Sequence, residues 1–280
     1  MNEVGSDVVR EAEHGDVVRP VQRLYAGYAF DLDGTLYLGG DALPGAADTV
    51  AELRRLGSAV AFVTNKPLEG APAYAHKLTG LGIPAEPEEV VSSLDALRLY
   101  LATYHPGASV VPVGEPLVHE SLADWGHPEA PANGAGEGDV VVVSFDRTFD
   151  YAKLLTAYRA VRAGAVIVAT NPDAYCPTPD GGLPDCAAIL AALEACTGVP
   201  AEAVVGKPSL HMAAAFLDRL GTAPGESAFV GDRIETDVAM GHAAGMAGIL
   251  VLTGATEAHQ VRHYPVHPDA VLRSVAELLP

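Results

Sequence analysis

The chain has 280 residues, of which 49% are hydrophobic and 19% charged, and its formal net charge is -19 with a pI near 4.7. This composition can bury a core and excludes a disordered chain. No run of Lys and Arg could neutralise backbone phosphates, which argues against a nucleic-acid partner. Because an acidic protein repels anionic substrates at long range, phosphate chemistry here would need a local cation.

The cysteines and the N-terminal segment indicate the cellular compartment in which the protein functions. Cys176, Cys186 and Cys196 have the spacing of neither a disulfide framework nor a zinc site. The first twenty residues are polar and acidic, and no later segment approaches the ~20 apolar residues of a membrane span. We therefore expect a soluble, cytoplasmic protein without a membrane partner, and a flexible arm over residues 1–20.

The first predicted elements form one alternating unit. Residues 24–31 have the apolar pattern of a buried strand, 44–56 the spacing of a helix, and 58–64 the pattern of a second strand. Strand, helix and strand in this order predict a right-handed parallel unit with its functional loops at the carboxyl ends of the strands. Asp31 and Thr64 would lie at such ends.

Further α/β elements follow, interrupted by a Gly/Pro-rich segment, 126–139, that we expect to be an exposed loop. After a turn-rich stretch over 171–185 the first pattern resumes. Its predicted elements are helices over 186–196, 211–221 and 236–245 and strands over 227–232 and 247–254. The sequence thus predicts an α/β protein with a Rossmann-like parallel sheet, split between 21–82 and 185–280, and an inserted α/β domain over 83–184.

Two carboxylates stand two residues apart directly after the first strand, in Asp31-Leu32-Asp33-Gly34-Thr35. An Asp/Gly turn without chemistry is one interpretation. An EF-hand loop is excluded, because Leu36 stands where that loop requires Gly. The functional interpretation makes Asp31 a nucleophile and metal ligand, and Asp33 the general acid for the leaving alcohol.

A second acidic segment, Gly231 to Asp237, follows the predicted strand over 227–232. Taken alone, it reads equally well as a helix N-terminus with acids at the positive end of the dipole. Together with Asp31, however, Asp232 and Asp237 supply the carboxylate oxygens that Mg2+ prefers.

Lys207 and the pair Thr64-Asn65 are the candidate phosphate ligands. Lys207 is not a Walker A lysine, because Ala201 stands where Gly is required and Pro208 where Ser or Thr should follow. It is either a solvated surface lysine or a fixed counter-charge for a phosphoryl group. Thr64-Asn65 offers a hydroxyl and backbone N–H groups at a strand end.

The ordered segments AFDLDGTLY, FVTNKP, VVGKPS and FVGDRIETD resemble the four motifs of the haloacid dehalogenase superfamily of phosphatases. An insertion between the second and third motifs resembles the C2 cap class. The segments VPVGEPLVHESLADWG, SFDRTFDYAKL, IVATNPDAYCPT and DVAMGHAAGMAGILVLTG resemble its NagD-like, p-nitrophenylphosphatase-type branch, class IIA. Over residues 24–275 the sequence is most similar to arabinose-operon-type sugar phosphatases. Two segments depart from the pattern, with TNKPLEG in place of TNNS and PDCAAI in place of a PGAGAL-like sequence.

The resemblance implies a role for each matching residue. Asp31 and Asp232 would bind Mg2+ through their carboxylates and Asp33 through its backbone carbonyl. Asp237 would support these ligands without touching the metal. Thr64 and Lys207 would hold the phosphoryl oxygens, Asn65 would shape the adjacent loop, and the cap loop would present Asn171, Asp173 and Tyr175.

The sequence thus predicts an Mg2+-dependent phosphatase that cleaves a small phosphomonoester, a sugar or cyclitol phosphate, through an aspartyl-phosphate on Asp31. A phosphomutase and a sugar-phosphate-binding regulator without turnover are the alternatives. A dehalogenase is disfavoured, because it needs neither Asp33 nor magnesium, and a purely structural protein is disfavoured because reactive groups stand at three strand ends. A homodimer formed through the cap is left open.

Overall fold

The structure is a computed structural model that describes residues 17–131, 138–178 and 181–280. The chain divides into two compact units. One is built from the residues up to Val63, from Tyr74–Val90 and from Phe216–Pro280, and the other from Thr64–Ala73 and Val91–Ala215. The expected functional division into a core over 21–82 and 185–280 and a cap over 83–184 stays a prediction.

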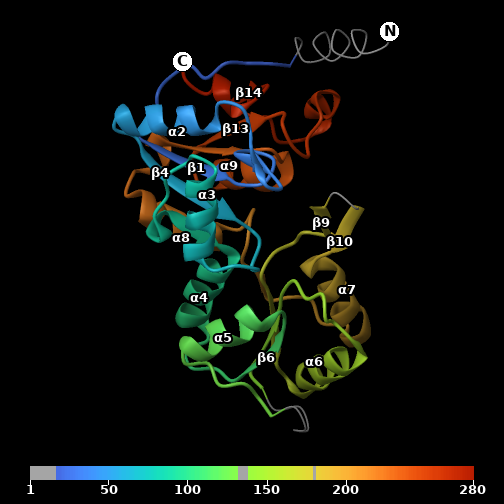
Figure 1. The fold of residues 1–280 in the computed structure, drawn as a ribbon. Helices are drawn as coiled ribbons and strands as arrows, with labels where there is room; N and C mark the ends of the chain where they lie inside the picture. The colour runs from blue at the N-terminus through green and yellow to red at the C-terminus, as the bar shows by residue number, and fades with distance from the viewer. Residues whose placement is uncertain (1–16, 132–137, 179–180) are drawn as a thin grey trace. The chain divides into compact units, whose positions relative to one another are not determined.

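A six-stranded sheet runs through the first unit (Figure 1). Its order is β14 (Ala270–Leu272), β13 (Ala247–Val251), β12 (Ser227–Gly231), β1 (Gly27–Asp31), β4 (Ala59–Thr64) and β5 (Val90–Ser92). The pairs from β14 to β4 are parallel, which confirms the Rossmann-like sheet. Every residue of β1 and β12 is buried, as expected for strands covered on both faces.

The predicted strand over 24–31 is too long at its start. β1 begins at Gly27, and Leu24 is 40% exposed. A Cβ at Gly27 would overlap the Thr222 hydroxyl, so the chain passes close to its neighbour at the residue where pairing begins. A single apolar side chain before a strand does not extend the strand.

Within the described residues, helices α2 (Ala46–Arg55) and α9 (Ala239–Ala243) belong to this unit, as do the later parts of α3 (Ala71–Gly80) and α8 (Leu210–Leu220). In α2 the buried positions Ala46, Thr49, Val50 and Leu53 recur with helical spacing. The helix predicted over 236–245 is only partly correct. The segment Ile234–Val238 is a π-helical turn, and α9 follows it. Short 3-10 turns span Pro87–Glu89, Pro224–Glu226, Ala258–His263 and Val275–Glu277.

The second unit contains a four-stranded parallel sheet in the order β11 (Ala203–Val204), β8 (Val166–Ala169), β7 (Val140–Val143) and β6 (Val110–Val113). Its helices are α4 (Ser93–Tyr104), α5 (Pro116–Asp124), α6 (Tyr151–Ala163) and α7 (Cys186–Thr197). Valines of β6 and β7 pack with Ala157 and Ala160 of α6 and with Ile189 and Leu193 of α7 to form the core of this unit.

The segment expected to be only turn-rich forms an antiparallel hairpin of β9 (Tyr175–Thr178) and β10 (Gly181–Pro184). The strands were not predicted from the sequence, because the segment is rich in Gly and Pro and both residues are depleted in strands on average. A second hairpin, β2 (Tyr37–Leu38) with β3 (Asp41–Ala42), follows the first acidic motif. Of the predicted loop over 126–139, residues 132–137 lie outside the described residues, and Glu129 bridges to Val110.

Residues near the start of the chain join the sheet edge. Arg19 and Val271 exchange two backbone hydrogen bonds of 2.8 and 2.9 Å. Of the expected flexible arm over 1–20, residues 1–16 lie outside the described part. The three cysteines all lie in the described part of the chain, and none of them forms a disulfide. Among the described helices, none combines the length and the apolar character needed to cross a membrane.

Candidate active site

Asp31 and Asp232 stand at the carboxyl ends of adjacent strands. Asp31 is the last residue of β1, and Asp232 directly follows β12, which is paired with β1 up to Phe30 and Val230. The chain's strand order reverses between these two strands, since β4 lies on the other side of β1. Such a switch point opens a crevice at the carboxyl ends of a parallel sheet, and ligands bind there.

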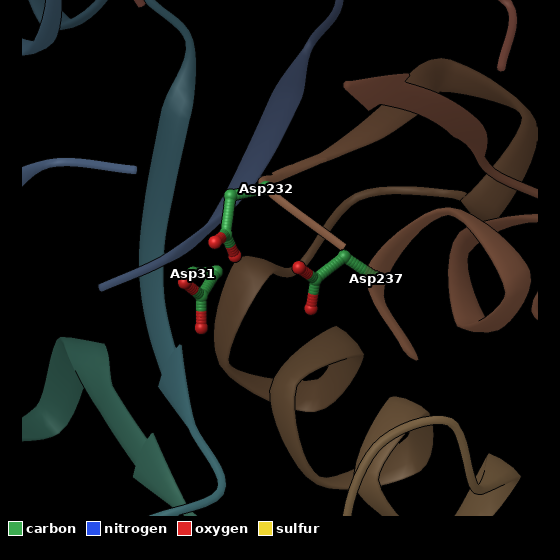
Figure 2. Close-up of side chains that lie close together, drawn as sticks. All are labelled: Asp31, Asp232 and Asp237. Carbon is green, nitrogen blue, oxygen red and sulfur yellow. The ribbon is translucent and has the colours of Figure 1, made fainter. Parts of the chain in front are cut away.

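Three carboxylates gather at this edge (Figure 2). One oxygen from each of Asp31, Asp232 and Asp237 lies within 4.8 Å of the other two. Their residues are only 8%, 5% and 1% exposed. Like charges this close and this buried repel one another strongly unless a cation compensates them. Three carboxylate oxygens are also the donors that Mg2+ prefers, so the residues present fit a divalent cation.

Asp232 is held between two glycines. A Cβ at Gly34 would lie 2.5 Å from Asp232 Oδ2, and a Cβ at Gly254 would overlap the same oxygen. Gly34 also has a φ of +87°, which disfavours any side chain. The Ala255 N–H donates to Asp232 Oδ2 at 2.6 Å. The two glycines therefore leave room for one carboxylate, and the Ala255 N–H fixes its orientation.

Asp237 is held by the π-helical turn. The Arg233 N–H donates to Asp237 Oδ2 at 3.0 Å, and the Asp237 N–H donates back to the Arg233 carbonyl at 3.0 Å. A Cβ at Gly231 would overlap the Asp237 carboxylate. Such turns occur often at functional sites, because they redirect one side chain. Here the turn brings the Asp237 carboxylate into the same group as Asp31 and Asp232.

Asp31 and Asp33 flank a tight turn. The Leu36 N–H donates to the Leu32 carbonyl at 2.9 Å, and the Thr35 hydroxyl donates to Asp31 Oδ2 at 3.3 Å. Asp33 is half-buried, and its carboxylate is outside the group of three. Sequence reasoning missed Thr35, although a hydroxyl four residues after the acid was a signal.

A second set of predicted site residues meets within the other unit. The Lys207 N–H donates to Asn65 Oδ1 at 2.7 Å, and Asn65 Nδ2 donates to the Lys207 carbonyl at 3.2 Å and to Asp173 Oδ2 at 2.9 Å. The Asp173 N–H donates in turn to Asn171 Oδ1 at 3.0 Å. The amide of Asn65 therefore ties together three segments that are far apart in the sequence.

Gly206 allows this close approach. A Cβ there would overlap the Thr170 carbonyl and lie 2.7 Å from Asn65 Oδ1. Sequence reasoning missed this glycine's packing role.

The remaining predicted residues lie near this cluster in the chain. Thr64 is 4% exposed and accepts a hydrogen bond from the Lys66 N–H at 3.2 Å. Tyr175, the first residue of β9, is 55% exposed, and its ring leaves no room for a Cβ at Gly182 on the opposite strand. Tyr175 is thus a largely exposed aromatic side chain at the start of this hairpin.

Comparisons with known proteins agree along nearly the whole chain. The haloacid dehalogenase-like hydrolase family matches residues 28–127, and a HAD-hydrolase-like family matches residues 204–278. The sugar-phosphatase AraL of Bacillus subtilis is 34% identical over 267 residues, which are 95% of either chain. An acid sugar phosphatase of Staphylococcus aureus is 34% identical over 91% of this chain and 97% of that protein.

Solved structures are similar as well. A 4-nitrophenylphosphatase from Thermotoga maritima is 31% identical with a TM-score of 0.84, covering 91% of this chain and 96% of that one. A p-nitrophenyl phosphatase from Archaeoglobus fulgidus is 30% identical with the same TM-score of 0.84, covering 91% and 98%.

Proposed function

The chain belongs to the haloacid dehalogenase-like hydrolases as a phosphatase of class IIA, and we propose that it hydrolyses sugar or cyclitol monophosphates with Mg2+ as its cofactor. The observation that carries the proposal is the buried group of Asp31, Asp232 and Asp237 at the switch point of the sheet. Three buried carboxylates are costly without a cation, and phosphoryl transfer needs one.

In the proposed mechanism Asp31 is the nucleophile. Its carboxylate attacks phosphorus, the bond to the leaving oxygen breaks, and Asp33 gives that oxygen a proton. Asp33, now a base, takes a proton from water, which attacks the aspartyl-phosphate and releases inorganic phosphate and free Asp31. When bound, the divalent cation offsets the negative charge of the phosphoryl group. Asp31, Asp232 and the Asp33 carbonyl would hold it, with Asp237 beside them.

Lys207 and Thr64 would hold the phosphoryl oxygens. The two hydrogen bonds between the Asn65 side-chain amide and the Lys207 backbone support this role, because they fix the lysine's main chain while its side chain carries the charge. A positioned ammonium stabilises transition-state charge without reorganisation.

The leaving group would be recognised by the proposed cap over 83–184, through Asn171, Asp173 and Tyr175. Amide and carboxylate groups can hydrogen-bond hydroxyls, and the exposed Tyr175 ring can cover a sugar face. The relatives named sugar phosphatase support a hydroxyl-rich leaving group. The proposed partner is thus a small phosphomonoester, and a homodimer through the cap stays open.

Phosphate release over a panel of sugar, cyclitol, glycolate, pyridoxal and nucleotide monophosphates tests this function. We expect a sugar or cyclitol phosphate to give the highest kcat/KM, and we expect EDTA to abolish turnover until Mg2+ is restored. A nucleotide as best substrate would contradict the substrate class, and turnover in EDTA would contradict the metal. Transfer of phosphate within a sugar bisphosphate, instead of release, would favour the phosphomutase.

The metal site can be tested without turnover. Gly254→Ala should displace the Asp232 carboxylate and lower Mg2+ affinity by about 10 to 100-fold, measured by calorimetric titration. Gly225→Ala is the matched control, because a Cβ at Gly225 meets nothing within 4 Å. Equal affinities for the two variants would remove Asp232 from the metal site.

A further inference from the structure

Asn65 contacts two residues to which the proposed function gives separate tasks. Lys207 would hold a phosphoryl oxygen, whereas Asp173 would meet the leaving group. Both accept hydrogen bonds from the side-chain amide of Asn65, and all three residues lie in the second unit. One amide therefore joins the proposed phosphate ligand to the proposed ligand of the leaving group.

The hydrogen bonds of the Asn65 amide allow only one orientation. Its Oδ1 accepts from the Lys207 N–H at 2.7 Å, and its Nδ2 donates to the Lys207 carbonyl at 3.2 Å and to Asp173 Oδ2 at 2.9 Å. A rotated amide would place Nδ2 against an N–H group and Oδ1 against a carboxylate. The two acceptors thus use both hydrogens of Nδ2, one for Lys207 and one for Asp173.

The backbone of Asn65 is fixed as well. Its carbonyl accepts from the Ser93 hydroxyl, at the start of α4, at 2.8 Å and from Asn171 Nδ2 at 3.4 Å. Asn65 is 7% exposed and Ser93 is fully buried. A buried hydrogen-bond network whose members are all paired is rigid. A displacement of Asp173 would therefore be transmitted to the Asn65 amide instead of being absorbed by a loose backbone.

The main chain of Asp173 is held by other segments. Its N–H donates to Asn171 Oδ1 at 3.0 Å, and its carbonyl accepts from the Ala187 N–H of α7 at 3.1 Å. The residue is half-buried, and since a carboxylate has about four acceptor positions, the hydrogen bond to Asn65 does not exhaust it. Asp173 can thus accept from a hydroxyl of the leaving group while it stays bound to Asn65.

We propose that Asn65 is a positioning residue that couples recognition of the leaving group at Asp173 to the placement of Lys207. A hydroxyl that binds Asp173 also restrains the amide that holds the Lys207 backbone. The inference rests on the proposed function for the tasks of Lys207 and Asp173, and it extends that function. A leaving group with a hydroxyl in reach of Asp173 gains stabilisation of the transition state as well as affinity.

Inorganic phosphate tests the coupling, because it has no leaving group that Asp173 could bind. Asp173→Ala removes an acceptor of Asn65 and should weaken phosphate binding about fivefold, measured by calorimetric titration with Mg2+ present. Asp173→Asn is the matched control, because its amide oxygen still accepts from Asn65, and it should bind phosphate at least as tightly as wild type. Loss of the negative charge alone would strengthen binding in both variants. Equal affinities of the two variants, whether raised or lowered, would overturn the proposal.

A double-mutant cycle shows whether the effect passes through Asn65. Asp173→Ala should lower kcat/KM for p-nitrophenyl phosphate about fivefold in wild type and less than about twofold in the Asn65→Ala background. It should lower kcat/KM for the best sugar phosphate of the panel in both backgrounds, because the hydroxyl contact is lost in each. Tyr175→Ala is the control and should have the same effect with and without Asn65. Additive losses of Asn65→Ala and Asp173→Ala for p-nitrophenyl phosphate would overturn the proposal.

The melting temperature gives a readout that needs neither turnover nor ligand. Asp173→Ala should lower it by less in the Asn65→Ala background than in wild type. If Asn65→Ala does not fold, Asn65→Asp replaces it, alone and combined with Asp173→Asn. The single variant brings two carboxylates together, whereas the combination exchanges donor and acceptor and should melt at the higher temperature. A combination no more stable than Asn65→Asp would overturn the proposal.

Failure of the proposed function has a different signature. A wild type that releases phosphate from no ester of the panel would contradict the proposed function, and the phosphate titration and the melting temperatures would still decide the coupling. An active wild type whose variants at Asn65 and Asp173 act independently would contradict the coupling alone.

Discussion

The chain contains two parallel sheets whose carboxyl ends carry different chemistry. The six-stranded sheet ends in carboxylates, with Asp31 and Asp232 beside Asp237. At the carboxyl ends of β7 and β8 in the four-stranded sheet, the Thr170 hydroxyl donates to the Ser144 hydroxyl at 3.0 Å, and the buried Asp146 pairs with Lys153 Nζ at 2.6 Å. Both arrangements are buried, but only the first of the two brings three carboxylates within 4.8 Å of one another.

This difference shows how one architecture serves two tasks. A group of carboxylates is complete only with a cation, so its sheet end is suited to metal-assisted chemistry. Polar and charged groups that satisfy one another need no ligand and hold the adjoining loop in place. The fold alone therefore does not determine where the functional site lies. The side chains at the strand ends determine it.

The largest loss of activity is expected when the proposed nucleophile at the end of the six-stranded sheet is removed. Asp31→Asn should lower kcat by about 10⁴-fold or more, because an amide neither attacks phosphorus nor binds a cation as an anion. Steady-state phosphate release measures this loss. Asp41→Asn, an exposed acid in β3, is the charge-matched control and should keep wild-type activity. Substantial turnover in the Asp31 variant would exclude it as nucleophile.

A smaller loss is expected at Asp33, and it should depend on the leaving group. Asp33→Asn should slow aspartyl-phosphate formation about 10²-fold for a sugar phosphate, and less for p-nitrophenyl phosphate, whose leaving group needs no proton. Rapid quenching of single turnovers measures this step. Equal slowing of both substrates would mean that Asp33 is not the general acid.

Stability should respond in opposite directions at the group of three carboxylates and at the contact between Asn65 and Lys207. Without added metal, Asp232→Asn should raise the melting temperature by a few degrees, because it relieves repulsion among three acids. Asn65→Ala should cost about 1–3 kcal/mol, because the buried Lys207 backbone loses both partners on Asn65. Denaturation of both variants in EDTA checks this contrast. A less stable Asp232 variant would contradict the assignment of the carboxylates as a strained, cation-dependent group.

The smallest effect is expected at the hairpin. Tyr175→Ala should lower kcat/KM for the best sugar phosphate by about tenfold, an effect of about 1.4 kcal/mol, with little change for p-nitrophenyl phosphate. Tyr151→Ala, another strongly exposed tyrosine, at the start of α6, is the matched control. An equal fall in kcat/KM for both substrates would show that Tyr175 does not contribute to recognition of the leaving group.

Much of this protein was predictable from the sequence. Strands such as β1 and β12 are recognisable in the sequence as apolar runs that end in an acid. Asp31 and Asp232 could therefore both be predicted as metal ligands at strand ends. The long helices α6 and α7 also follow their apolar periodicity. These features depend on neighbours within a few residues, which sequence patterns report well.

Other features depend on partners far along the chain. The contact of Gly254 with Asp232, the hydrogen bonds of Asn65 with Lys207, and the pairing of β9 with β10 join segments that no local pattern connects. Local sequence patterns were enough to identify the residues that carry reactive groups and the strand ends at which they stand. Which of these residues meet depends on the folded chain, because close packing and the burial of charge are set by the whole fold.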